Sequence, residues 1–135
     1  MQINGKFLYD DLQKRAMEAA ERSFCTGADH QIGFALGLQK AASIVFELIH
    51  KVGSCLNVNR IFSEFYIAEY DLLEEFFEVE NPPDVLTPLR GEMEALMSAR
   101  EIVDAHRQAA EAEQRAIEED EPPEPSPEVL YDYED

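Results

Sequence analysis

The sequence DHQIGFALGLQKAASIVFELIHKV, residues 29–52, contains the most apolar part of the chain and predicts a long central helix. Its apolar residues recur every three or four positions and cover a wide arc, as is typical of a helix surrounded by others. The members of this arc are Gly37, Ala41, Ile44, Val45, Leu48, Ile49 and Val52, with Leu38 and Ala42 alongside. We expect Asp29 to cap the first turn of this helix and Gly53 to end it.

This segment is expected to be a core helix and not a membrane span. Polar side chains interrupt its most apolar part, Ile32 to Ile49, at Gln39, Lys40, Ser43 and Glu47. The first residues of the chain also lack a basic region followed by an apolar one, so no signal peptide is expected. These features predict a cytoplasmic protein.

Helical spacing continues on both sides of this segment. A first helix is expected from about Phe7 to Phe24, with Gly27 as its stop. Its apolar arc contains Leu8, Leu12, Ala16, Ala19, Ala20, Ser23 and Phe24. A third helix, about Arg60 to Val79, follows the expected loop GSCLNVN, in which Asn57 or Asn59 can supply the cap. The side chains that it is expected to bury are Phe62, Phe65, Tyr66, Leu73 and Phe76.

The fourth helix is expected to begin with Thr87 as N-cap and Pro88 as first helical residue, and to reach about Asp120. Its apolar seam, spaced by seven residues, weakens along the helix through Leu89, Leu96, Val103, Ala110 and Ile117. The second half should therefore project into solvent or meet another chain. The predicted fold is an all-α, antiparallel four-helix bundle over residues 1–120 with a long, partly protruding C-terminal helix, followed by an acidic, Pro-rich, flexible tail over residues 121–135.

The charge of the chain limits its partners. It has 29 acidic and 11 basic residues, a net charge of −18, and the last eighteen residues supply nine of the acids and no base. The field of such a chain repels nucleic acid and anionic membranes and attracts basic protein surfaces. We therefore expect no direct contact with nucleic acid or membrane.

The acidic end of the chain is the predicted contact with a partner. Its final segment VLYDYED sets aromatic and aliphatic side chains among carboxylates, which a purely solubilising tail does not require. The candidate partner-binding residues are Glu118, Glu119, Asp120, Glu121, Tyr131, Asp132, Tyr133, Glu134 and Asp135. A solvated tail without a partner is the alternative.

One acidic pattern suggests an enzyme. Glu74-Glu75-x-x-Glu78 is followed by Glu101-x-x-Asp104, and this pair of motifs resembles the EExxE and ExxD acids of MazG-like, all-α NTP pyrophosphohydrolases. The resemblance implies Mg²⁺-dependent cleavage of a phosphate anhydride. The helical spacing instead places Glu75 and Glu78 roughly 120–180° from the inward face of their helix, on the solvent side. We therefore expect no catalytic residue, metal or cofactor.

Other chemical motifs are incomplete. Glu47-x-x-His50 is half of a di-iron carboxylate signature, and its second half is missing. Cys25 and Cys55 are not spaced as a metal site and are expected to be free thiols. Glu69 lies on the inward face of the third helix, where a carboxylate needs a partner, and Arg100 or Arg107 can provide it.

Small residues form a strip on the central helix. Gly33, Gly37 and Ala41 recur every four positions, so another helix backbone can approach closely. Because a glycine inside a helix costs about 1 kcal/mol relative to alanine, the strip calls for an explanation. Tight packing within the bundle, a homodimer interface and a ligand slot are the alternatives.

The leading hypothesis is a non-enzymatic, acidic helical interaction protein that binds a basic protein surface. It would act as an inhibitor or nucleic-acid mimic, of the type that phages encode, and block a nucleic-acid-binding partner. The alternatives are a MazG-like NTP pyrophosphohydrolase and a homo-oligomeric structural or adaptor protein.

Overall fold

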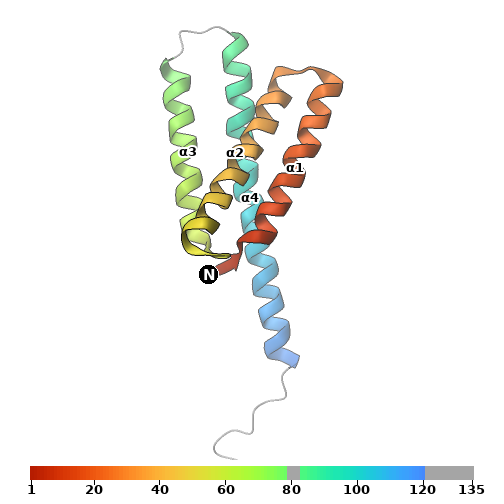
Figure 1. The fold of residues 1–135 in the computed structure, drawn as a ribbon, viewed down its shortest axis with the longest axis vertical. Coiled ribbons are helices and arrows are strands. Elements are labelled where there is room, and N and C mark those ends of the chain that lie inside the picture. The colour runs from red at the N-terminus through yellow and green to blue at the C-terminus, as the bar shows by residue number, and fades with distance from the viewer. Residues whose placement is uncertain (79–82, 121–135) are drawn as a thin grey trace, which may run out of the picture.

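The structure, a computed structural model, describes residues 1–78 and 83–120 and confirms the all-α fold. Its helices are α1 (Gly5–Thr26), α2 (Asp29–Val52), α3 (Val58–Glu78) and α4 (Pro83–Asp120). Successive helices run in opposite directions, and α2 lies against both α1 and α4, whereas α3 stands at the edge of the bundle (Figure 1). The second half of α4 extends beyond the other helices, as expected (Figure 1).

Glycines end the first two helices, as predicted. Gly27 has the left-handed φ of 63° and donates its N–H to the Ser23 carbonyl, and Gly53 has φ 95° and donates to Ile49. The predicted cap of α2 is wrong, because Ala28 occupies the N-cap position and Asp29 is the first helical residue. The Asp29 carboxylate therefore acts on α2 through the helix dipole and not as a capping acceptor.

Two short strands join the helices at one end of the bundle, where a loop was expected. β1 (Gln2–Asn4) pairs antiparallel with β2 (Cys55–Asn57), and Ile3 lies opposite Leu56. Strands of three residues are too short for a period of two to be visible in the sequence. Both strands end in caps: Asn4 accepts hydrogen bonds from the first N–H groups of α1, and Asn57 does so for α3.

The predicted start of α4 is also wrong. The helix begins at Pro83, so Pro88 lies inside it and Thr87 is not its N-cap. Pro83 suits the first helical position, since its fixed φ matches the helix and its missing N–H would have no partner there. Pro88 removes one intrahelical donor near the start of the helix.

Side chains from all the helices fill the core, but some predicted members lie outside it. The buried side chains include Leu8, Leu12, Val45, Leu48, Ile61, Phe65, Leu72, Leu96 and Val103. The side chains that were expected to be buried but are exposed are Phe24 (91%), Val52 (55%), Tyr66 (55%) and Leu73 (37%). Phe24 and Val52 lie in the last turns of their helices, whereas Tyr66 and Leu73 lie on the side of α3 away from its core residues, where Arg100 of α4 contacts Tyr66.

Within the described residues, α2 is the one helix that is long and apolar enough to cross a membrane, on length and composition alone. The polar interruptions at Gln39 and Lys40 do not remove this property, contrary to the expectation from sequence. The core helix of a bundle passes the same test. In this structure Ala41, Val45 and Leu48 of α2 are buried among the other helices.

Candidate protein-interaction surface

The projecting half of α4 carries part of the predicted contact. Glu113, Glu118 and Glu119 are exposed on it, and Asp120 is its last residue. The predicted contact residues Glu121, Tyr131, Asp132, Tyr133, Glu134 and Asp135 lie outside the described residues. The described part of the contact is thus a helical rod, residues 108–120, whose first part still borders β1 at Ala109, Ala110 and Glu113. Its end extends beyond the other helices (Figure 1).

Arg107 stabilises α4 where it leaves the bundle. Its guanidinium lies 2.8 Å from Asp104 and 2.9 Å from Glu111, at spacings of three and four residues along the helix. The hydrogen bond from Arg107 lowers the pKa of the Asp104 carboxyl, and the same pairing raises the pKa of Arg107. Pairs of this kind stabilise helices that lack tertiary packing.

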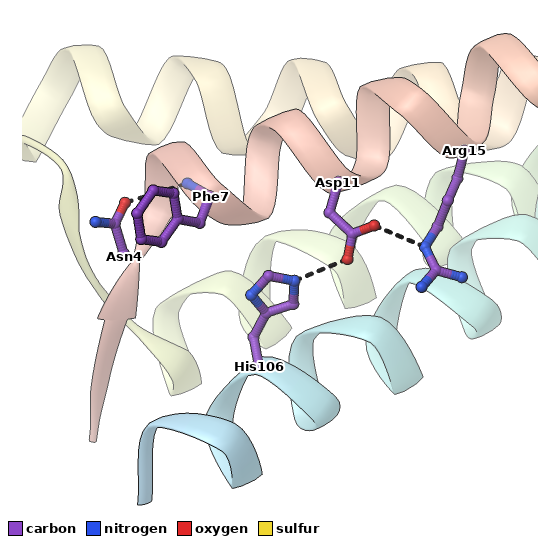
Figure 2. Close-up of polar contacts among 5 residues, drawn as sticks. All are labelled: Asn4, Phe7, Asp11, Arg15 and His106. Atoms are coloured by element: carbon purple, nitrogen blue, oxygen red, sulfur yellow. Dashed lines mark hydrogen bonds and ion pairs between the residues drawn. The ribbon is translucent and has the colours of Figure 1, made fainter. Parts of the chain in front are cut away.

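A cross-helix hydrogen bond connects α4 to α1. His106 Nε2 lies 2.8 Å from Asp11 Oδ2, while Arg15 Nε donates to Asp11 Oδ1 at 2.9 Å (Figure 2). Burial raises the pKa of the Asp11 carboxyl, but the hydrogen bonds from His106 and Arg15 outweigh it and lower that pKa. Sequence analysis missed this pair, because Asp11 lies on a polar arc and its partner is 95 residues away.

We expect Asp11→Asn to lower the free energy of unfolding at neutral pH by about 1 kcal/mol or less, since the site is partly exposed. A carboxyl whose pKa is lowered by folding stabilises the fold above its unfolded pKa, and this contribution disappears as the pH falls through the folded pKa. Native protein and variant should therefore converge in acid. Urea unfolding across this range measures it, with the exposed neighbour Asp10→Asn as control. A difference that is constant with pH would contradict the assignment.

A groove between α1 and α4 runs beside this hydrogen bond, and residues of α2 lie at its floor. Its volume is about 550 Å³. Its lining residues include Asp11, Arg15, Glu18, Arg22, Phe34, Leu38 and Glu101. Acidic and basic groups alternate along it, so the groove does not select a ligand of either charge.

Arg100 connects α4 to α3 and confirms the partner predicted for Glu69. Its Nη2 donates to Glu69 Oε1 at 3.0 Å, and its Nη1 donates to the Tyr66 hydroxyl at 3.0 Å. The guanidinium also lies 4.7 Å from the centre of the Tyr66 ring, in cation–π contact. Arg107, the other candidate partner, pairs along its own helix instead.

The acids of the MazG-like motif do not converge in the described part of the chain. Glu74, Glu75 and Glu101 are exposed, and Asp104 is paired with Arg107. No group of three or more His, Cys, Asp or Glu side chains is close enough there to hold a metal ion. The pKa of the Glu92 carboxyl is raised. Burial and the nearby Glu75 carboxylate raise it, and together they outweigh the opposite effect of Lys40.

The remaining motif residues are separate from one another. His50 packs edge-on against Phe46, with ring centres 4.5 Å apart. Cys25 and Cys55 are free and exposed, as expected, and Cys55 Sγ donates to Gln2 Oε1 at 2.8 Å.

The small-residue strip of α2 packs against α4 within the chain. A Cβ atom at Gly33 would lie 2.0 Å from the Pro88 carbonyl oxygen, and one at Gly37 would lie 2.6 Å from Ala95 Cβ. Gly91 completes the contact from α4, since a Cβ there would lie 2.2 Å from the His30 carbonyl oxygen. The sequence did not indicate the role of Gly91, because a single glycine forms no repeating pattern. In this bundle α4 occupies the strip, so neither a second chain nor a ligand can use it.

Comparison with protein-family models, curated proteins and solved structures finds no match to this chain.

Proposed function

We propose that this chain is a non-enzymatic, acidic helical interaction protein that binds a basic surface on another protein in the cytoplasm. It would inhibit a nucleic-acid-binding partner by occupying the cationic surface that the nucleic acid needs, as phage-encoded mimics do. The observation that carries the proposal is the projecting half of α4, an acidic helix whose end extends beyond the bundle (Figure 1). Such a rod can enter a cationic cleft without steric conflict from the other helices.

The charge of the rod supports mimicry of a nucleic-acid strand. Residues 108–120 contain five acids, Glu111, Glu113, Glu118, Glu119 and Asp120, and one base, Arg115. At a rise of 1.5 Å per residue they span roughly 20 Å, or about one carboxylate per 4 Å. One strand of DNA carries a phosphate every ~3.4 Å. Five acids less one base give the rod a net charge of −4, or about one net negative charge per 5 Å. Glu111 is also paired with Arg107, so the rod has the same sign as a nucleic-acid strand but a lower charge density.

The acidity of the rest of the chain adds long-range attraction. The described residues contain 22 acids and 11 bases, a net charge of −11, so the bundle and the rod have the same sign. A field of one sign accelerates association with an oppositely charged protein and makes it depend on salt.

Capture of a partner from host lysate by the immobilised full chain tests the proposal. We expect the captured protein to be basic, and its yield to fall about tenfold or more between low and moderate salt. We also expect the rod variant Glu113→Gln/Glu118→Gln/Glu119→Gln to lose most of the capture.

The matched control is Asp10→Asn/Glu18→Gln/Glu21→Gln, which removes the same number of exposed charges from α1. It should retain most of the capture. Capture that does not depend on salt would contradict the proposal, and equal losses in the rod variant and the control would exclude the rod as the contact.

A further inference from the structure

Helix α3 carries a line of large apolar side chains that is separate from its core face. We call this line the aromatic stripe. Its members are Tyr66 (55% exposed), Tyr70 (63%), Leu73 (37%) and Phe77 (81%). Their spacings of four, three and four residues place them on one face of the helix. The core face of α3, with Ile61, Phe65 and Leu72, points elsewhere.

The position of α3 explains why the stripe is uncovered. The helix stands at the edge of the bundle and packs mainly on α4 (Figure 1). Single exposed apolar residues are common on protein surfaces, whereas a continuous line of them is typical of an interaction site. The stripe covers about three turns, roughly 16 Å.

The stripe continues into a hollow between α3 and α4. The hollow has a volume of about 340 Å³ and contains Tyr66 at one side and Met97 at the other. Met97 is itself 51% exposed. Arg100 holds the Tyr66 ring by the hydroxyl bond and the cation–π contact, so one end of the stripe is rigid before any partner arrives.

Acidic groups lie on both sides of this apolar surface. Glu74 is exposed on α3 next to the stripe, and Glu101 is exposed at the hollow on α4. The one cation that lines the hollow, Arg100, is paired with Glu69. Charge complementarity therefore requires an occupant with an apolar face and cationic flanks. An acidic second copy of this chain does not meet this requirement.

We propose that the aromatic stripe of α3 is a docking surface for a basic amphipathic helix of a partner protein. Apolar anchors on successive turns of such a helix would contact the stripe, as in other helix-in-groove complexes, while its Lys and Arg side chains meet the acidic flanks. The inference rests on the proposed function, since it names the class of basic partner. It uses a different surface from the projecting rod of α4.

A defined peptide tests this docking. The probe is a labelled Leu/Lys peptide of about 18 residues whose Leu side chains lie on one helical face, and its control is a scrambled peptide of the same composition. Fluorescence anisotropy with the full chain should show at least tenfold tighter binding of the amphipathic peptide. Tyr70→Ser/Phe77→Ser should remove this preference, whereas Met17→Ser/Phe24→Ser, which removes exposed apolar side chains from α1, should not.

The stripe variant should keep the native melting temperature, because both side chains are mostly exposed. Glu74→Lys is a second variant that reverses one flank, and it should weaken the amphipathic peptide more than the scrambled one. Equal binding of both peptides to the native chain and the stripe variant would overturn the docking proposal and leave the proposed function standing. Absence of salt-dependent binding to either peptide would overturn both the docking proposal and the proposed function. A native dimer that the stripe variant converts to monomer would make a second copy the occupant, and would also overturn the docking proposal.

Discussion

Gly33→Ala is expected to lower the free energy of unfolding by about 2–3 kcal/mol, although alanine is the better helix former by about 1 kcal/mol. The added Cβ would lie 2.0 Å from the carbonyl oxygen of Pro88 and 2.7 Å from its Cα. Both are backbone atoms, so no side-chain rotation can relieve the overlap. Helices α2 and α4 must separate, and the apolar contacts around Leu96 and Val45 loosen with them.

Urea unfolding followed by far-UV circular dichroism measures this loss. The control is Ser43→Ala, which adds helix propensity on the exposed side of the same helix and should leave stability unchanged or slightly higher. Gly91→Ala tests the contact from the α4 side and should cost a similar amount, since its Cβ would lie 2.2 Å from the His30 carbonyl oxygen. A Gly33→Ala protein as stable as the native one would mean that these two helices do not approach so closely.

This contact illustrates how far local sequence patterns reach. The spacing of Gly33, Gly37 and Ala41 correctly indicates a close helix approach, because small residues on one face permit it whatever the neighbour is. The identity of that neighbour depends on the path of the whole chain. Gly91, which completes the contact, has no local pattern that distinguishes it from any other helical glycine.

The prediction of which α3 side chains are buried was partly wrong for a related reason. Hydrophobic spacing gives the direction in which a helix faces the core, but not how wide the covered arc is. An edge helix that packs mainly on one neighbour buries a narrow arc, so Tyr66 and Leu73 remain outside it while Ile61 and Leu72 lie inside. The aromatic stripe exists because the apolar arc of α3 is wider than the surface that covers it.

Polar contacts also differ in how well the sequence predicts them. The partner of Glu69 could be predicted, since a carboxylate on an inward face needs a cation and few cations lie near the facing seam. The pairing of Asp11 with His106 could not, because both residues lie on polar arcs where most side chains meet only water.

The Glu69–Arg100 pair carries the second large expected effect. Glu69→Ala should lower the free energy of unfolding by about 1–3 kcal/mol, less than for a fully buried pair. The two side chains are 12% and 27% exposed, so screening by water is limited but present. Among the described residues, Arg100 Nε has no hydrogen-bond partner, so loss of Glu69 leaves the guanidinium with the Tyr66 contacts alone.

A double-mutant cycle with Glu69→Ala and Arg100→Met separates the pair from its surroundings. The double variant should lose less free energy of unfolding than the two single variants lose in sum, by about 1 kcal/mol or more. The exposed pair Arg60–Glu64, at 3.7 Å, is the matched control and should show a coupling near zero. Arg100→Lys should keep the charge but not both hydrogen bonds, since an ammonium lacks the planar fork that reaches Glu69 and Tyr66 together. If Arg100→Lys retains full stability and the cycle shows no coupling, the Glu69–Arg100 pair does not stabilise the fold.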